Sequence, residues 1–268
     1  MPIAIQEDML TGSTILEKFR HAQALGVAGI EFWGTGLTAK VPEIALAMAE
    51  TGIRAAAVNH GWQGNLLDPD PAERERALAH LRQSIVNAVD IGAAGVIFVP
   101  HFGAPVLPDL SPWMSSAELE AEMLHMHLRT LSDYAEALGV DLYVEPINRY
   151  ETHLLNRLEQ AARVTRRLNH PRVKIVADLF HMALEETDTA AAIHAHADCI
   201  GHVHLADHNR RLPGEGMIDF AAAAAALKAI GYTGWLAYEC GSSSKSEPDD
   251  YRDRLPASLA YLRAAGLT

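Results

Sequence analysis

Short apolar runs rich in β-branched residues alternate with longer, more polar stretches along the whole chain of 268 residues. The short runs have the length and composition of buried strands, and the longer ones have the length and capping residues of helices. We therefore predict eight strands, at residues 3–6, 29–33, 54–58, 95–99, 141–144, 173–177, 200–205 and 234–238. The predicted helices span residues 13–25, 42–50, 70–91, 115–138, 158–168, 189–197, 220–230 and 249–265.

Strict alternation of strands and helices implies a parallel sheet with right-handed crossovers. Eight such units in about 250 residues are typical of a closed (β/α)₈ barrel. No linker, low-complexity segment or break in composition interrupts the pattern, so we expect one α/β domain, a TIM barrel over residues 1–268. An open, doubly wound sheet is the alternative. It is disfavoured because no Gly-rich phosphate fingerprint follows the first strand.

A carboxylate or an imidazole stands at or beside the C-terminal tip of every predicted strand, where such barrels carry their active sites. These residues are Glu7, Glu31, His60, His101, Glu145, Asp178, His204 and Glu239. The last four follow consecutive strands and are separated by 33, 26 and 35 residues, each about one strand–helix unit. Their side chains are therefore expected to reach the same mouth of the barrel.

Three carboxylates and an imidazole that meet at one point repel one another unless a cation neutralises them. A single such residue would be read more simply as a polar strand end in contact with water, but four in register favour a metal site. We predict that Glu145, Asp178, His204 and Glu239 bind one divalent ion. Mixed oxygen and nitrogen ligands suit Mn²⁺, our first choice, or Mg²⁺ or Co²⁺, and Zn²⁺ less well.

Several neighbouring residues have two interpretations. His202 shares a strand face with His204 and is either a partner of the site or a core imidazole. The tryptophans Trp33, Trp62 and Trp113 either stack on a sugar or pack the rim, and we place none of them in the site. The run Ser242–Lys245 is either a phosphate-binding loop or a flexible polar loop, and Arg149 has no assigned role beyond a salt bridge.

The net charge of −12 argues against a nucleic-acid-binding surface, which needs clustered basic residues. Two cysteines, Cys199 and Cys240, cannot form a disulfide framework, and the chain shows no secretory leader and no apolar run long enough to span a membrane. We therefore expect a cytoplasmic protein without a membrane or nucleic-acid partner.

Four motifs in this order resemble the xylose-isomerase-like TIM barrel superfamily, and within it the ketose 3-epimerase branch typified by D-tagatose and D-psicose 3-epimerases. They are Glu145-Pro-Ile-Asn-Arg-Tyr-Glu-Thr-His-Leu-Leu-Asn156, Asp178-Leu-Phe-His-Met182 with Glu185-Glu186, His202-Val-His-Leu-Ala-Asp-His-Asn-Arg210 with Pro213-Gly214-Glu215-Gly216, and the strand end at Glu239. The resemblance covers nearly the whole chain. It implies a metal-dependent isomerase acting on a small sugar, and a homodimer or homotetramer.

Carried over by position, the resemblance implies that the four predicted ligands hold one ion. It also implies that Glu151, His181 and Arg210 contact the substrate around its C1–C2 end. Glu145 and Glu239 would exchange the C3 proton of a ketose through an enediolate, each on one face of the sugar. An aldose–ketose isomerase on the same ion is the main alternative. The net charge disfavours an apurinic endonuclease, and the paired glutamates disfavour a non-catalytic sugar-binding barrel.

Overall fold

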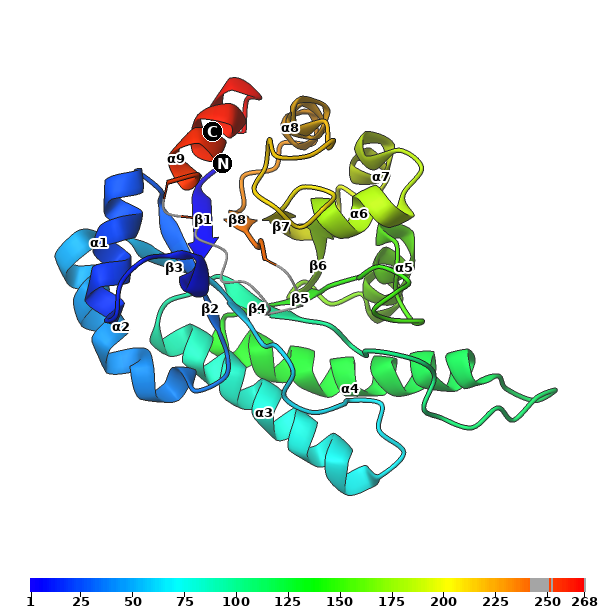
Figure 1. Ribbon diagram of the computed structural model, residues 1–268. Coiled ribbons are helices and arrows are strands. Elements are labelled where there is room, and N and C mark those ends of the chain that lie inside the picture. The colour runs from blue at the N-terminus through cyan, green and yellow to red at the C-terminus, as the bar shows by residue number, and fades with distance from the viewer. Residues whose placement is uncertain (242–250, 252, 268) are drawn as a thin grey trace.

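The eight predicted strands are present, and they close into a parallel barrel in chain order (Figure 1). The computed structural model describes residues 1–241, 251 and 253–267. Each strand pairs in parallel with the next, and the last strand pairs with the first. The strands are β1 (Ile3–Gln6), β2 (Gly29–Trp33), β3 (Arg54–Asn59), β4 (Gly95–Phe98), β5 (Asp141–Val144), β6 (Val173–Asp178), β7 (Ile200–Leu205) and β8 (Leu236–Tyr238). The (β/α)₈ fold predicted from the alternating pattern is confirmed.

Helices surround this barrel and cover the outward faces of its strands (Figure 1). They are η1 (Glu7–Met9), α1 (Ile15–Leu25), α2 (Leu37–Thr51), α3 (Pro71–Asp90), α4 (Ser116–Leu138), α5 (Leu158–Leu168), α6 (Leu179–Glu185), α7 (Thr189–Ala195), α8 (Phe220–Ala229) and α9 (Leu255–Ala264). Several begin at polar caps. Thr14 and Ser115 each form a capping box, and Asp70 accepts a hydrogen bond from the Ala72 amide. Within the described residues, no helix is long and apolar enough to cross a membrane.

Three helices depart from the prediction, and one of them, α9, begins at Leu255, although helix was predicted from residue 249. Helix α2 begins at Leu37 instead of Pro42, because Leu37 is fully buried and its packing outweighs the amide hydrogen that Pro42 lacks inside the helix. Helix α6 is absent from the predicted helices. It forms because the Asp178 side chain accepts a hydrogen bond from the His181 amide at 3.0 Å and so caps the helix. The predicted run Ser242–Lys245 lies outside the described residues.

Large rings fill the barrel below the mouth, and small residues make room for them. The ring of Tyr143 on β5 lies against Gly95 on β4 and Gly201 on β7, where a Cβ at Gly201 would come within 2.6 Å of the Tyr143 ring. Tyr143 precedes Glu145 by two residues on the same side of its strand, and its ring stacks on His202 with 5.5 Å between centroids. The mouth therefore rests on a packed aromatic layer, as in other barrels with filled interiors.

Replacing Gly95 with alanine should destabilise the fold, because the new methyl group would lie 2.7 Å from the Asp141 carbonyl oxygen and collide with the Tyr143 ring. We expect the free energy of unfolding in urea to fall by about 1–3 kcal/mol. The control Glu43→Ala, at an exposed position of α2, should change it by less than about 0.5 kcal/mol. Equal stability of Gly95→Ala and the wild type would contradict this account of the packing.

Candidate active site

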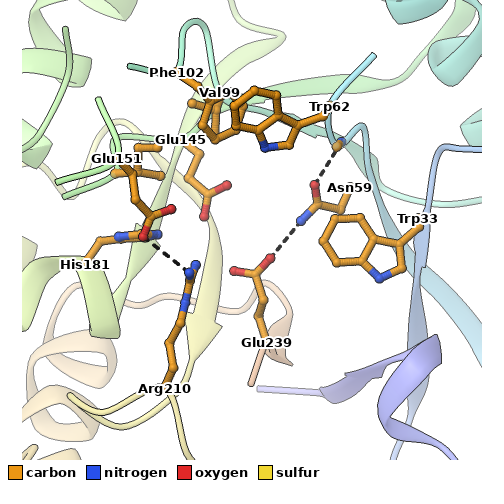
Figure 2. A pocket seen from close by; sticks show the side chains of 12 residues that line it. Trp33, Asn59, Trp62, Val99, Phe102, Glu145, Glu151, His181, Arg210 and Glu239 are labelled. Carbon is orange, nitrogen blue, oxygen red and sulfur yellow. Dashed lines mark hydrogen bonds and ion pairs between the residues drawn. The ribbon is translucent and has the colours of Figure 1, made fainter. Parts of the chain in front are cut away.

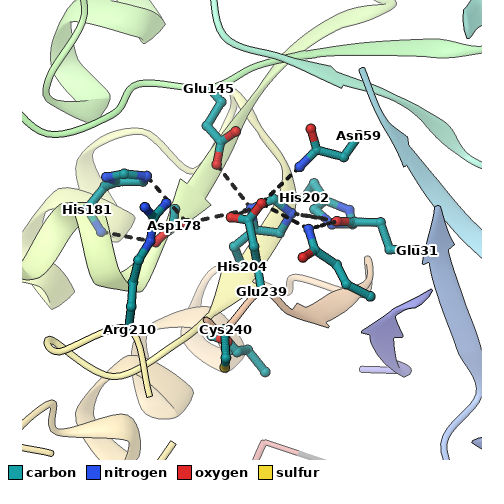
Figure 3. A network of polar contacts seen from close by, with 12 residues as sticks. Glu31, Asn59, Glu145, Asp178, His181, His202, His204, Arg210, Glu239 and Cys240 are labelled. Carbon is teal, nitrogen blue, oxygen red and sulfur yellow. Dashed lines mark hydrogen bonds and ion pairs between the residues drawn. The ribbon is translucent and has the colours of Figure 1, made fainter. Parts of the chain in front are cut away.

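The four residues predicted as metal ligands meet at the C-terminal ends of β5 to β8 (Figure 3). One ligand atom from each of Glu145, Asp178, His204 and Glu239 lies within 4.8 Å of the others. The His204 ring is at the centre. Its Nδ1 atom is 3.0 Å from Glu145 Oε1, 3.6 Å from Asp178 Oδ2 and 3.0 Å from Glu239 Oε2. The convergence expected from the strand ends is therefore what the fold produces.

The electrostatics of this group suit a cation. Burial first, and then the charge of Glu239, raise the pKa of Glu145 to about 8. Burial lowers the pKa of His204, but Glu239, Glu31 and Glu145 outweigh it and hold that pKa well above its usual value. A protonated His204 thus supplies the positive charge among the buried carboxylates. A divalent ion would supply that charge instead, and three carboxylates with one imidazole are a donor set that fits Mn²⁺ or a similar ion.

A second layer of polar side chains orients the group from β1, β2 and β3. The other ring nitrogen of His204, Nε2, lies 3.1 Å from Glu31 Oε1, so that Nδ1 faces the three carboxylates. The Gln6 amide donates to Glu31 at 3.0 Å and to Glu239 at 2.9 Å, and the Asn59 amide donates to Glu239 at 2.9 Å. A carboxylate on the second nitrogen of a ligating histidine fixes its tautomer and ring orientation.

His202 belongs to this layer as well as to the core. It is fully buried, and its Nε2 atom lies 2.8 Å from Glu31 Oε2. Burial alone would raise the pKa of Glu31, but His204 and His202 hold it below its usual value, so Glu31 is an anion between two imidazoles. Sequence reasoning placed Glu31 at a strand end but left it out of the site. The signal that could have included it was that strand-end position on β2, because β2 is only three strands away from the His204 strand, β7, around the closed barrel.

His181, a predicted substrate contact, lies on α6 as a neutral imidazole. Its Nδ1 atom accepts a hydrogen bond from the backbone N–H of Asn148 at 3.0 Å, which assigns the ring proton to Nε2. Burial lowers the pKa of His181, in agreement with a neutral ring. The Nε2 hydrogen is therefore available to a ligand in the pocket that His181 helps to line.

The other two predicted substrate contacts, Glu151 and Arg210, lie on the same wall as His181 (Figure 2). Arg210 donates to Glu151 Oε1 at 3.3 Å, and its guanidinium lies 4.6 Å from the centre of the Phe180 ring. The side-chain amide of Asn148 donates to Glu151 Oε1 at 2.8 Å. The β5 and β7 loops thus hold a carboxylate and a guanidinium side by side at the mouth.

A pocket of about 210 Å³ lies over the predicted metal group. Figure 2 shows Glu145 and Glu239 reaching into it from different sides, with His181, Glu151 and Arg210 on one flank. The remaining lining is mostly apolar and includes Trp33, Trp62, Val99, Phe102 and Ile147. All three predicted substrate contacts and both predicted acid/base residues therefore share one cavity.

The remaining strand-end residues contact neighbouring helices and loops. Glu7 pairs with Lys40 at 3.0 Å, the His60 ring contacts the Ser84 hydroxyl at 2.9 Å, and His101 contacts the Ala104 carbonyl at 2.8 Å. None of the three belongs to the group of converging ligand atoms among the described residues.

Arg149 does form the salt bridge expected of it. It pairs with Glu185 of α6, with 2.8 Å between Nη2 and Oε2, and so fastens the β5 loop to α6.

The family model for the xylose isomerase-like TIM barrel matches residues 19–265, which is most of the chain. The chain belongs to the xylose isomerase-like TIM barrel family. This confirms the family expected from the four motifs.

Two curated relatives extend the family assignment. The chain is 33% identical to 3-dehydro-D-guloside 4-epimerase of Escherichia coli, over 98% of this chain and 99% of that protein. It is 31% identical to D-psicose 3-epimerase of Ruminiclostridium cellulolyticum, over 68% of this chain and 62% of that protein. Both relatives are epimerases of sugars, and they confirm the prediction of an isomerase-class enzyme.

Solved structures agree with the fold. The apo form of 3-keto-D-glucoside 4-epimerase from Escherichia coli matches with a TM-score of 0.86 and 32% identity, over 98% of this chain and 99% of that one. A D-psicose 3-epimerase crystallised in the presence of D-fructose matches with a TM-score of 0.85 at 22% identity, over 99% of both chains, and shows the shared barrel.

Replacing Glu31 with glutamine should weaken metal binding, because His204 would lose the carboxylate that orients it. We expect the affinity of EDTA-stripped protein for Mn²⁺ to fall about 10–100-fold, measured by isothermal titration calorimetry. Glu7→Gln, which alters another buried strand-end carboxylate outside the group, is the matched control and should keep the wild-type affinity. An unchanged affinity in Glu31→Gln would remove Glu31 from the site.

Proposed function

We propose that this protein is a divalent-metal-dependent epimerase that inverts the carbon next to the ketone of a keto sugar. The observation that carries the proposal is the position of Glu145 and Glu239. Both belong to the candidate metal group, and both line the same pocket. A carbon next to a carbonyl is acidic enough for such a carboxylate pair to exchange its proton, provided that the resulting negative charge is stabilised.

The two glutamates divide the proton transfer between them. Glu145 follows β5 and Glu239 follows β8, so they approach a sugar in the pocket from different strands of the barrel. One removes the proton from one face of the sugar, and the other returns a proton to the opposite face, which inverts the carbon. A bound divalent ion supplies Lewis-acid stabilisation of the enediolate charge.

The wall of Glu151, His181 and Arg210 positions the sugar. The Nε2 hydrogen of His181 and the guanidinium of Arg210 are donors for the carbonyl and neighbouring hydroxyl oxygens, where negative charge develops. Glu151 accepts from Arg210 and has a second oxygen for a sugar hydroxyl. These assignments follow the family resemblance and agree with the arrangement of the wall.

The reacting carbon has two candidates. The sequence predicts C3 of a ketose, and the D-psicose 3-epimerase relative supports it over part of the chain. The second candidate is C4 of a 3-keto glycoside, favoured by the relative named 3-dehydro-D-guloside 4-epimerase, which matches over 98% of the chain. In both cases the inverted carbon adjoins a ketone, so the same glutamate pair serves. Mn²⁺ as the ion, a cytoplasmic location and a homodimer or homotetramer are further parts of the proposal.

The Mn²⁺-loaded protein incubated in D₂O with ketoses, ketose phosphates and 3-keto glucosides should place deuterium on one carbon next to the ketone. NMR of the products should show the epimer, and EDTA should abolish exchange until a divalent ion is returned. Deuterium transfer between C1 and C2 with an aldose product would instead establish an aldose–ketose isomerase. Full activity after removal of all metal would end the proposal.

Replacing either glutamate with glutamine should show which of the two exchanges the proton of each epimer. In Glu145→Gln we expect turnover to fall by about 10²–10⁴-fold. Deuterium wash-in should also be lost from the epimer whose proton faces Glu145. Glu239→Gln should lose wash-in from the other epimer. Because both residues are also predicted ligands, Mn²⁺ content must be measured in each variant, and wash-in compared at equal loading. Wild-type wash-in from both epimers in Glu145→Gln would refute its assignment as a base.

A further inference from the structure

Trp62 is 77% exposed although it lines the pocket, and its ring stacks on Phe102 with 4.0 Å between centroids and 22° between planes. We propose that this aromatic pair is a second subsite, which binds an uncharged ring joined to the reacting keto sugar through a glycosidic bond. The inference rests on the proposed function and favours its second candidate, a keto glycoside. A sugar ring with an apolar C–H face and an aromatic aglycone share the chemistry that such a surface recognises.

The size of the pocket places this ring outside it. A cavity of about 210 Å³ is smaller than the ~300–1,000 Å³ of pockets that enclose drug-sized ligands, so it suits a single monosaccharide. With the reacting sugar between Glu145 and Glu239, any further ring has to lie at the rim. Figure 2 shows Trp62 and Phe102 at that rim, on the side of the pocket away from Arg210.

The charges around the pocket favour an uncharged second ring. Arg210 lies on the side of the pocket away from Trp62 (Figure 2). Among the described lining residues, the side that carries Trp62 and Phe102 adds Val99 and Trp33, which are apolar, and Asn59, whose amide is engaged with Glu239. These residues offer no cation to bind a phosphate or a carboxylate. The indole of Trp62, in contrast, can stack on a flat apolar face of a ligand.

The loop that carries Phe102 is fixed in place before any ligand arrives. The Gly103 amide donates to the Glu151 carbonyl at 2.7 Å, and the His153 amide donates to the Gly103 carbonyl at 3.1 Å. The His153 ring spans the Gly103 carbonyl and the buried carboxylate of Glu120, at 2.8 and 2.5 Å. Glu120 also accepts from the Val106 amide at 2.9 Å. A surface held in this way loses little conformational entropy when a ring stacks on it.

The test compares glycosides that share the reacting sugar and differ in the attached group. Methyl 3-keto-β-D-glucopyranoside, its phenyl counterpart and 3-keto-cellobiose are assayed by deuterium exchange, with KM and kcat determined separately. For wild type we expect a lower KM with the two ring-bearing compounds. In Trp62→Ala the ratio of the phenyl or cellobiose KM to the methyl KM should rise about tenfold, the value of one lost aromatic stack. Trp62→Phe should retain most of the preference.

Trp113→Ala is the matched control, because Trp113 is also exposed, at 73%, and is absent from the pocket lining. It should keep the wild-type KM ratio. A ratio that is the same in Trp62→Ala and wild type would overturn the proposal. A change of oligomeric state in Trp62→Ala, measured by light scattering, with an unchanged KM ratio would also overturn it. Trp62 would then contact another copy of the chain. Preference for phenyl alone would identify an aromatic aglycone, and preference for both would include a second sugar.

Failure of the proposed function can be told apart from failure of the subsite. If wild type exchanges deuterium with no keto sugar, the proposed reaction is wrong. Binding of the unreactive phenyl and methyl β-D-glucopyranosides, followed by saturation-transfer NMR titration, then tests the subsite alone. Tighter binding of the phenyl compound that is lost in Trp62→Ala and kept in Trp113→Ala supports the subsite, and equal binding in all three proteins removes it.

Discussion

The imidazole of His204 is the group around which the mouth of this barrel is arranged. One ring nitrogen faces three carboxylates and the other faces a fourth, that of Glu31, and the ring is almost completely inaccessible to solvent. So many buried anions are tolerable only with a compensating positive charge, whether on the ring or on a bound ion. Burial raises the pKa of Glu145 and lowers that of His204, but neighbouring carboxylates, Glu239 among them, raise both above their usual values, because they favour the protonated form of each group.

The residues that line the pocket above His204 fall into three groups. In the proposed mechanism, the carboxylates at the base of the pocket bind the ion and exchange the proton of the sugar. The wall of His181, Glu151 and Arg210 presents oriented donors, because Asn148 fixes the His181 tautomer and Phe180 supports Arg210. The rim away from Arg210 carries the stacked rings of Trp62 and Phe102. A rigid barrel with variable loops allows these parts to differ between relatives that share the fold, which is why epimerases with different named substrates match this chain.

Much of the site could be predicted because parallel strands bring their C-terminal ends to one rim. Strand order and polarity follow from periodicity, so Glu145, Asp178, His204 and Glu239 could be expected to meet. The same reasoning treated Glu31, His60 and His101 alike, although Glu31 reaches the central histidine and the other two hold loops. The strand pairing is irregular beside Glu31 and beside His202, which periodicity does not predict. Between β2 and β3, two residues, Ala56 and Ala57, face the single residue Glu31, which is a β-bulge. Between β6 and β7, Gly201 has no partner on β6.

The sequence by itself determined the closed barrel, the ring of ionisable strand ends and the four residues that could share an ion. These depend on alternation and spacing, which are properties of the chain as written. The tertiary structure decided which second carboxylate orients His204, which nitrogen of His181 carries its proton, and that Trp62 lines the pocket whereas Trp113 does not. Those outcomes depend on distances across the barrel, and residues far apart in the sequence acquire such distances only when the strands have closed and the loops have packed.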